Sequence, residues 1–258
     1  MTGNHLLDHL PAAELRRLLA QSVSLPLLSG QQLATQGLPS RALLFPMQGF
    51  VSLMTPLDGH APLQVGMVGR EGVLGAQLLL GVAASSLTVL VQQEGQAVSL
   101  PAAELRRQLP TSPALRRLLM RYLAVQLRQV ATAAACLCFH ALQARLARWL
   151  LMGQDRATGD GFAVTQEALA LRLGVRRVGV TVAAGSLQQA GLIRYHRGWV
   201  TVCDRAGLEA AACDCYARDQ ASYRQGMAFP PQAAPRRAVA LMSTRAATLA
   251  IDADRMSL

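Results

Sequence analysis

The sequence predicts an α+β protein with three consecutive parts: a strand-rich front, a long helix, and a helix-turn-helix followed by a β-hairpin. Short apolar segments alternate with turn residues before residue 101. From Pro113 the apolar period changes from two residues to about 3.6, which marks a helix. Near Gly174 a tight turn joins two short helical segments, and a turn at residues 196–198 joins two strand-like segments.

The front half has the strand pattern of a small antiparallel β-barrel or jelly roll. We expect a short helix first, at residues 10–19. The strand-like segments that follow lie at residues 43–45, 49–54, 63–68, 87–92 and 96–100. Pro46, the turn at residues 56–59 and the Glu94-Gly95 pair separate them. Segments of this length and spacing favour a small antiparallel barrel or sandwich.

An uninterrupted helical pattern runs from Ala114 to Met152, as one helix or as two separated by a bend. Apolar residues recur on one face at Met120, Leu123, Leu127, Val130, Ala134 and Leu137. Little of the chain is left to cover so long a face. We therefore expect a dimer interface, formed by Met120, Leu123, Leu127 and Val130. Packing onto the barrel is the alternative use of this helix.

The C-terminal part begins with a predicted cap at Thr165 and a helix over residues 166–172. After the turn at Gly174, a second helix is expected over residues 176–190. Its buried side can draw on Val178, Val182, Ala183 and Leu187. Gly191 ends this helix, and residues 192–195 and 199–203 form the hairpin.

The basic residues gather in the back half. All 25 basic residues among the 258 are Arg, and the net charge is +10. Residues 1–109 hold six Arg and six acids, whereas residues 140–226 hold eleven Arg and seven acids. A neutral front and a basic back are typical of a sensor joined to a polyanion-binding domain. No nucleophile–base pair, metal triad or phosphate loop is visible, so an enzyme is not expected.

The N-terminus lacks a basic region followed by an apolar run, so no secretory signal is predicted. The uncharged stretch at residues 72–93 is punctuated by Gly and Ser, which favours strands and turns over a membrane helix. Five cysteines, an odd number, argue against a disulfide framework. We expect a cytoplasmic protein without a membrane segment.

Several motifs, in this order and spacing, resemble the bacterial Crp/Fnr family of transcription regulators over roughly residues 5–225. They read Phe45-Pro46-x-x-Gly49-x-Val51-Ser52-Leu53, Gly66-x-x-Gly69-x-Glu71-Gly72-x-x-Gly75, Thr165-Gln166-Glu167-Ala168-Leu169-Ala170 and Leu173-Gly174-Val175-Arg176-Arg177. The resemblance implies a cyclic-nucleotide-binding-like β-barrel (jelly roll) at 1–110, a dimerisation helix at 111–139 and a winged helix-turn-helix at 140–226. The tail at 227–258 is expected to be weakly ordered.

The resemblance also implies a homodimer that binds a palindromic site in double-stranded DNA and contacts RNA polymerase. The second helix would enter the major groove. The DNA-binding residues would be Gln166, Arg176, Arg177, Val178, Thr181, His196 and Arg197. Arg177 matches the family's guanine-reading Arg, and Val178 stands where the cyclic-AMP receptor has an acidic base reader. His196 and Arg197, at the wing tip, would contact phosphate.

The effector pocket implied by the resemblance departs from that of cyclic-AMP binders. Its residues would be Gly72, Val73, Leu74, Gly75, Ala84, Ser85 and Ser86. Val73 replaces the Glu that holds ribose, and Ala84 replaces the Arg that holds the cyclic phosphate. A buried phosphate without a cation is costly, so cyclic AMP is disfavoured. If a phosphate were bound, Arg70 is the candidate cation.

No cofactor or metal is predicted. The chain has no Cys before Cys136, so the family's N-terminal iron–sulfur cluster is disfavoured, while haem stays open. Cys136 and Cys138 should point to different faces of a helix. Cys213 and Cys215 could form a metal or redox pair with Cys203, although ordinary packing is favoured. His140 is interpreted as structural.

The function predicted is therefore a DNA-binding transcription regulator that responds to an effector other than cyclic AMP. The alternative is a ligand- or redox-sensing module whose winged domain binds protein without sequence-specific DNA contact. Salt-dependent binding to duplex DNA would separate the two.

Overall fold

The structure is a computed structural model that describes residues 2–228. The predicted tail lies outside the described residues from residue 229 onward. Residues 2–227 form one compact unit that contains both the front and the back of the chain.

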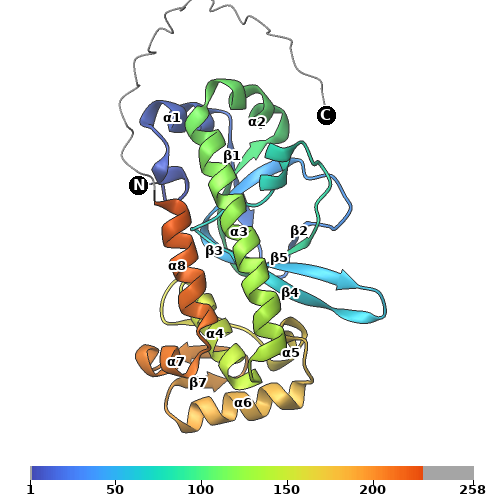
Figure 1. Cartoon of the computed structure of the whole chain (residues 1–258), viewed down its shortest axis with the longest axis vertical. Coiled ribbons are helices and arrows are strands. Elements are labelled where there is room, and N and C mark those ends of the chain that lie inside the picture. The colour runs from blue at the N-terminus through green and yellow to red at the C-terminus, as the bar shows by residue number, and fades with distance from the viewer. Residues whose placement is uncertain (1, 229–258) are drawn as a thin grey trace, which may run out of the picture. The chain divides into compact units, whose positions relative to one another are not determined.

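The front half is a five-stranded antiparallel sheet with the strand order β1-β5-β3-β4, in which β2 also pairs with β5 (Figure 1). The strands are β1 (Val23–Leu27), β2 (Gln32–Ala34), β3 (Ala42–Leu57), β4 (His60–Val68) and β5 (Thr88–Pro101). Around them lie α1 (Ala12–Ala20), α2 (Ala102–Gln108) and the 3₁₀ turns η1 (Leu7–His9), η2 (Ala76–Leu80) and η3 (Leu109–Thr111). The sheet is jelly-roll-like, as predicted, and among the described strands its ladder is open.

Two of the predicted breaks in the sheet are wrong. Pro46 lies inside β3, where it pairs with Ala97 of β5, and Gly95 lies inside β5, where it pairs with Leu27 of β1. The pairing shifts register around Gln48. At this bulge a Cβ on Gly95 would collide with the carbonyl group of Gln48. Glycine therefore permits close approach of two long strands here instead of ending one of them.

The long helical pattern is two helices, α3 (Pro113–Phe139) and α4 (Leu142–Gln154). His140 and Ala141 between them have extended backbone angles, with ψ of 140° and 150°. The predicted bend is thus a corner at these two residues. The inner side of α3 packs on the front core through Leu115, Leu118, Leu119, Tyr122 and Val125.

The back half confirms the helix-turn-helix. It contains α5 (Gln166–Leu173), α6 (Arg177–Gln189), the wing strands β7 (Ile193–His196) and β8 (Trp199–Val202), and β6 (Gly161–Ala163), which pairs with β8. Thr165 caps α5 by accepting a hydrogen bond from the Ala168 amide at 3.1 Å. Gly174 follows α5 in the left-handed conformation, with φ of 64°.

Two further helices, α7 (Arg205–Ala211) and α8 (Cys215–Met227), were not predicted as elements. Helix α8 runs beside α3 and back to the front half (Figure 1). Its end is fixed there because Met227 is buried in the front core, and Arg121 Nε donates a hydrogen bond to the Gly226 carbonyl at 2.7 Å. The Tyr223 hydroxyl also donates to the Glu71 carbonyl at 2.8 Å.

The front and back halves share a hydrophobic core. Phe50, from the bulged part of β3, packs edge-to-face on Phe162 of the back half with ring centroids 6.1 Å apart. Trp149 of α4 packs on the other side of the contact, 5.9 Å from Phe162. Aromatic pairs of this kind add to the stabilisation from burial itself. Arg156 and Glu71 form an ion pair at 2.7 Å across the same boundary, and both are largely buried.

Among the described residues, α3 is the one helix whose length and apolar composition would also suit a membrane span. The stretch at residues 72–93 is not such a helix, because it contains η2, turns and the first part of β5. Four arginines lie along the first part of α3, at positions 116, 117, 121 and 128. Most of its apolar second part is exposed in the single chain.

Two helical glycines provide a matched test of the shared core. A Cβ on Gly153 would lie 2.6 Å from the buried ring of Phe162, whereas Gly185 has open space around it. We expect Gly185→Ala to raise the free energy of unfolding by about 1 kcal/mol, because Ala favours a helix over Gly. Gly153→Ala should lower it by about 1–3 kcal/mol, because the ring is held between Phe50 and Trp149.

Urea unfolding followed by circular dichroism would measure both changes. Equal stabilisation by the two substitutions would contradict tight packing at this boundary.

Candidate functional site

The first turn of α6 presents a basic, exposed surface. Arg176 is the N-cap residue and Arg177 the first residue of α6, and both side chains are exposed. Arg177 Nε lies 3.9 Å from a Glu167 carboxylate oxygen, and both side chains are about two thirds exposed. An ion pair this open and this long adds little stability, so it leaves the guanidinium of Arg177 available to a ligand.

Two exposed valines continue this surface. Val178 and Val182 are 66% and 70% exposed, one helical turn apart on α6. Of the four residues offered for the buried side of this helix, only Ala183 and Leu187 are buried. Val178 and Val182 instead face outward beside Leu142 and line a shallow hollow. Exposed aliphatic groups next to guanidinium donors suit contact with base edges, where a thymine methyl offers an apolar partner.

Gln166 and Thr181 join α5 to α6 at the same surface. The Thr181 hydroxyl donates a hydrogen bond to the Gln166 side-chain oxygen at 2.7 Å. The structure therefore brings five of the predicted DNA-binding residues together around the start of α6: Gln166, Arg176, Arg177, Val178 and Thr181.

The other two predicted residues, His196 and Arg197, lie exposed at the tip of the wing. Arg197 and Gly198 both have positive φ, 48° and 78°, and they connect His196 to its pairing partner Trp199. This is the geometry of a two-residue hairpin turn, which normally favours Asn-Gly. A left-handed conformation costs an arginine about 1–2 kcal/mol. Exposed Arg194 on β7 adds a cation that the sequence did not single out.

Tyr195 anchors the wing to the rest of the back half. Its hydroxyl donates a hydrogen bond to the Val164 carbonyl at 2.7 Å, and its amide donates to the Gln188 side chain at 2.6 Å. Burial raises the pKa of Tyr195 to about 12. Tyr195 therefore packs the wing against the rest of the back half, whereas the Trp199 side chain is half exposed.

A cavity of about 420 Å³ lies in the front half, beside the predicted effector pocket. Leu74, Gly75 and Ser85 line it, together with Arg41 at the start of β3. The other predicted pocket residues do not line this cavity: Gly72, Val73, Ala84 and Ser86. The volume is within the range of small-ligand sites.

The position of Val73 explains part of the difference between the predicted pocket and the observed cavity. Its side chain is fully buried in the front core, so it is a packing residue. Gly72 lies directly under the Tyr122 hydroxyl, where even a Cβ would collide. This segment is therefore packed against α3 more tightly than a ligand cassette requires.

The candidate cation for this cavity is Arg41, not Arg70. Arg70 lines a separate cavity of about 320 Å³ between the front half, α4 and α8, with Glu71 and Arg156. Arg41 was not distinguished by the sequence, because nothing local marks an arginine that precedes a strand.

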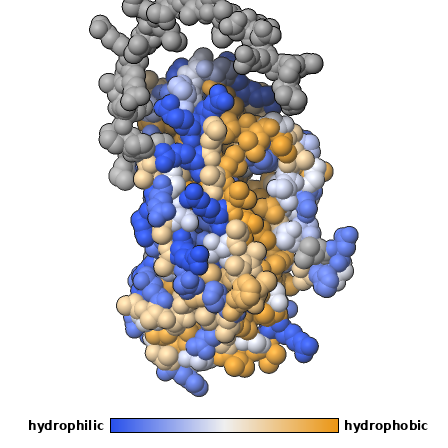
Figure 2. Space-filling view, viewed as in Figure 1, coloured by the Kyte–Doolittle hydropathy of each residue, from blue (hydrophilic) through white to orange (hydrophobic). Residues whose placement is uncertain are grey.

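The outer face of α3 is apolar and exposed. Met120, Leu127 and Val130 are 52%, 72% and 42% exposed. Leu123 is half-buried against the front core of its own chain, so it is less available than predicted. Alanines extend the exposed stripe, which steps by four and three residues through Met120, Ala124, Leu127, Ala131 and Ala134. Figure 2 shows apolar surface along α3 in this view. Such spacing is that of a coiled-coil seam.

Comparison with known proteins identifies the back half first. Residues 144–211 match the family profile of the Crp-like helix-turn-helix domain. Comparison with curated protein sequences gives no match. Solved structures with the same fold span nearly the whole described chain.

FixK2 from Bradyrhizobium japonicum is 15% identical, with a TM-score of 0.64; the match covers 74% of this chain and 98% of that one. A Crp/Fnr-family regulator from Eubacterium rectale is 16% identical, with a TM-score of 0.64 and coverages of 82% and 99%. A third, a CRP-family regulator from Thermus thermophilus, is 24% identical, with a TM-score of 0.60 and coverages of 73% and 96%. The back half thus contains a Crp-like helix-turn-helix domain, and the chain shares the fold of these Crp/Fnr-family structures.

The fold thus has the expected architecture, with the Crp-like helix-turn-helix at the matched residues. The front sheet takes the place of the sensor, α3 that of the dimerisation helix, and α6 that of the reading helix. The roles of the individual contact residues, and the domain boundaries at 110, 139 and 226, stay predictions.

The exposed stripe on α3 predicts the oligomeric state. A charge at Leu127 should convert a dimer to monomers, because two carboxylates would face each other across an apolar seam. Leu80→Glu is the matched control, since Leu80 is 66% exposed but lies off α3. Light scattering of Leu127→Glu should give the mass of a monomer and Leu80→Glu that of a dimer. A dimeric Leu127→Glu protein would show that another surface pairs the chains.

The cavity in the front half predicts which ligands do not bind. We expect no binding of cyclic AMP or cyclic GMP at physiological concentrations, since no carboxylate is placed for ribose at position 73. Calorimetry with the wild-type protein measures this directly. Micromolar affinity that disappears in Arg41→Ala would refute the prediction and assign the phosphate to Arg41.

Proposed function

We propose that this regulator binds a palindromic DNA site as a homodimer and responds to an effector other than cyclic AMP. The observation that carries the proposal is the exposed surface of Arg176, Arg177 and Val178 at the start of α6. Donors and apolar groups at this end of a reading helix match the way such helices meet base edges in the major groove.

Dimerisation explains why the DNA site would be palindromic. Two chains paired along α3 present two copies of α6, related by a two-fold axis. Half-sites would then lie about one helical turn, roughly 34 Å, apart. The wing cations Arg194 and Arg197 would add phosphate contacts, which position the protein without reading sequence.

The sensor would act through its contacts with the reader. Arg172 of α5 hydrogen-bonds Gln92 of β5 and stacks 5.7 Å from the Trp149 ring centre. Burial lowers the pKa of Arg172 to about 10, so it remains charged at neutral pH. A ligand that shifts β5 would move a charged contact to the helix-turn-helix, and the population of DNA-binding conformations would change.

The effector is proposed to be a small molecule in the 420 Å³ cavity. The similar regulator CLP from Xanthomonas campestris is c-di-GMP responsive (TM-score 0.61, 20% identity), which supports an effector other than cyclic AMP in this fold. We further propose that the protein is cytoplasmic and has no enzymatic activity. We also propose that it contacts RNA polymerase, as the resemblance to the Crp/Fnr family implies.

Selection of bound sequences from random duplexes tests the reading helix. Arg177→Ala should cost about 1–3 kcal/mol of binding free energy and relax one position in each half-site, because a bidentate guanine contact is lost. Arg107→Ala, an exposed arginine on α2, is the control and should change nothing. An unchanged motif in Arg177→Ala would show that Arg177 does not read bases.

Arg197→Asn should behave differently. It removes the cation yet suits the positive φ of the wing turn. Affinity for all sequences should fall alike, and the salt slope should decrease by about one. If the wild type selects no motif, with or without cell extract as a source of effector, the alternative of a module without sequence-specific DNA contact is favoured.

A further inference from the structure

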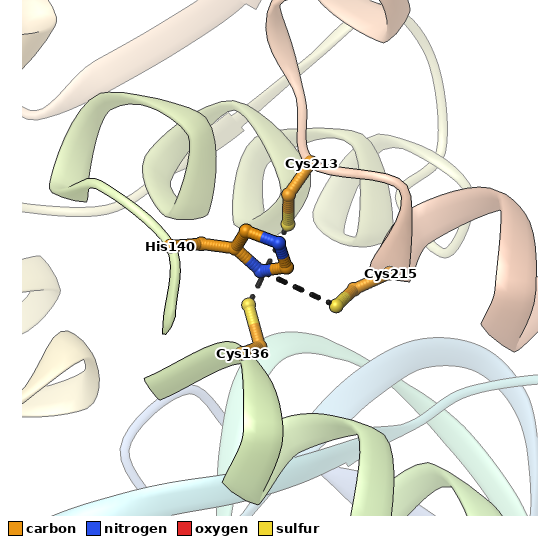
Figure 3. A group of neighbouring side chains, drawn as sticks. All are labelled: Cys136, His140, Cys213 and Cys215. Carbon is orange, nitrogen blue, oxygen red and sulfur yellow. Dashed lines mark hydrogen bonds between the residues drawn. The ribbon is translucent and has the colours of Figure 1, made fainter. Parts of the chain in front are cut away.

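Three cysteines and one histidine converge where α3 ends. Cys136, His140, Cys213 and Cys215 place one potential ligand atom each within 4.8 Å of all the others (Figure 3). Cys136, Cys213 and Cys215 are buried, and His140 is partly buried. The sequence suggested Cys203 as the partner of Cys213 and Cys215. Cys203 is instead exposed and lies outside this group, as does Cys138.

The fold explains the convergence. Cys136 lies in the last turn of α3, and His140 follows where that helix stops. The other two residues come from 73 or more positions further on, because Cys213 precedes α8 and Cys215 begins it. Two-apart cysteines would diverge within a helix, but these straddle a helix start, so both thiols point inward in Figure 3.

Two of the separations are close to those of a tetrahedral site for a single ion. Cys136 Sγ lies 3.5 Å from Cys213 Sγ, and Cys215 Sγ lies 3.5 Å from His140 Nδ1. Zinc bonds of about 2.3 Å to sulfur imply sulfur–sulfur separations of about 3.8 Å in a tetrahedron. A disulfide needs about 2.05 Å, and all five cysteines are free in the structure.

The surroundings suit a thiolate-rich centre. His140 Nε2 lies 3.5 Å from an Asp214 carboxylate oxygen, which would fix the ring so that Nδ1 faces the thiols, as outer carboxylates do for metal-bound histidines. Arg145 and Arg148 line one small cavity with Cys136. Arg148 is paired with Asp219 at 2.6 Å, and its buried Nε has no hydrogen-bond partner among the described residues.

The charges also balance. Three thiolates, a neutral imidazole and one divalent ion give a centre of charge −1. The Arg148–Asp219 and Arg218–Asp214 pairs are each neutral, so Arg145 supplies the compensating positive charge.

We propose that Cys136, His140, Cys213 and Cys215 bind one Zn²⁺ in a closed Cys₃His site. Four protein ligands leave no position for water or substrate, so the site is structural. It joins the end of α3 and the α3–α4 corner to the start of α8. The ion would therefore hold the reading domain at a set angle to the dimerisation helix.

Metal content of the intact, purified chain tests the proposal. Mass spectrometry of the elements should find about one zinc atom per chain. Cys136→Ser and Cys213→Ser should lose it, whereas the matched controls Cys138→Ser and Cys203→Ser should keep it. Wild-type protein stripped with a chelator and refilled with Co²⁺ should show the visible absorption of tetrahedral cobalt with thiolate ligands.

Two further measurements do not depend on the cysteine variants folding. Asp214→Asn keeps all four ligands, and it should weaken zinc binding by about 10–100-fold in a chelator competition. Removing the metal from the wild type should lower its melting temperature, and returning Zn²⁺ should restore it.

The proposal would be overturned if the wild type contained no metal and all five of its thiols reacted with a thiol reagent. A Cys136–Cys213 disulfide in the protein as isolated would also overturn it. Iron with acid-labile sulfide at these residues would replace the single ion with a cluster. Zinc retained equally by Cys136→Ser and Cys138→Ser would place the metal elsewhere.

Discussion

The corner between α3 and α4 is the constraint on which the rest of the chain depends. Helix α3 is oriented by the front core through Leu118, Leu119 and Tyr122. Helix α4 is oriented by the back core through Trp149 and Leu150. Because His140 and Ala141 leave the helical conformation between them, the two cores are joined at a set angle. In a paired molecule that angle determines the distance between the two copies of α6.

The contacts across the boundary have a common character. Phe50 on Phe162, Glu71 with Arg156 and Gln92 with Arg172 all connect the sheet to elements around the helix-turn-helix. Each is at least partly buried, so separating the halves would expose aromatic surface and leave charges unpaired. The reading surface is different, since Arg176, Arg177 and Val178 carry little internal stabilisation and are available to a ligand.

The parts that local pattern determines were predictable. The cap at Thr165, the tight turn at Gly174 and the wing turn at residues 196–198 each depend on a few adjacent residues, and all three are present. Pro46 and Gly95 misled because both residues usually end a strand, whereas here each lies within a strand that continues through a bulge. The strand order of the front sheet was not predicted, since pairing partners are set by distant residues.

The residues that the sequence missed are brought together by long-range packing. Arg41 reaches the sensor cavity only because β3 lies beside the segment around Leu74. The outward position of Val182 depends on which side of α6 meets α4. Cys136 and Cys213 are 77 positions apart, and the unpredicted helix α8 brings them together. No spacing rule within one segment would have selected these pairs.

The return of α8 has a mechanical consequence. The reading domain is connected to the sensor at one end by the α3–α4 corner and at the other by α8, whose last residue, Met227, is buried in the front core. The start of α8 lies beside that corner, with Cys215 Sγ 3.5 Å from His140 Nδ1, so both connections leave the domain at the same place. Any movement of the domain relative to the front half must therefore also shift the boundary contacts of Phe50, Glu71 and Gln92. A swing away from the sensor would first require Met227 to leave its core.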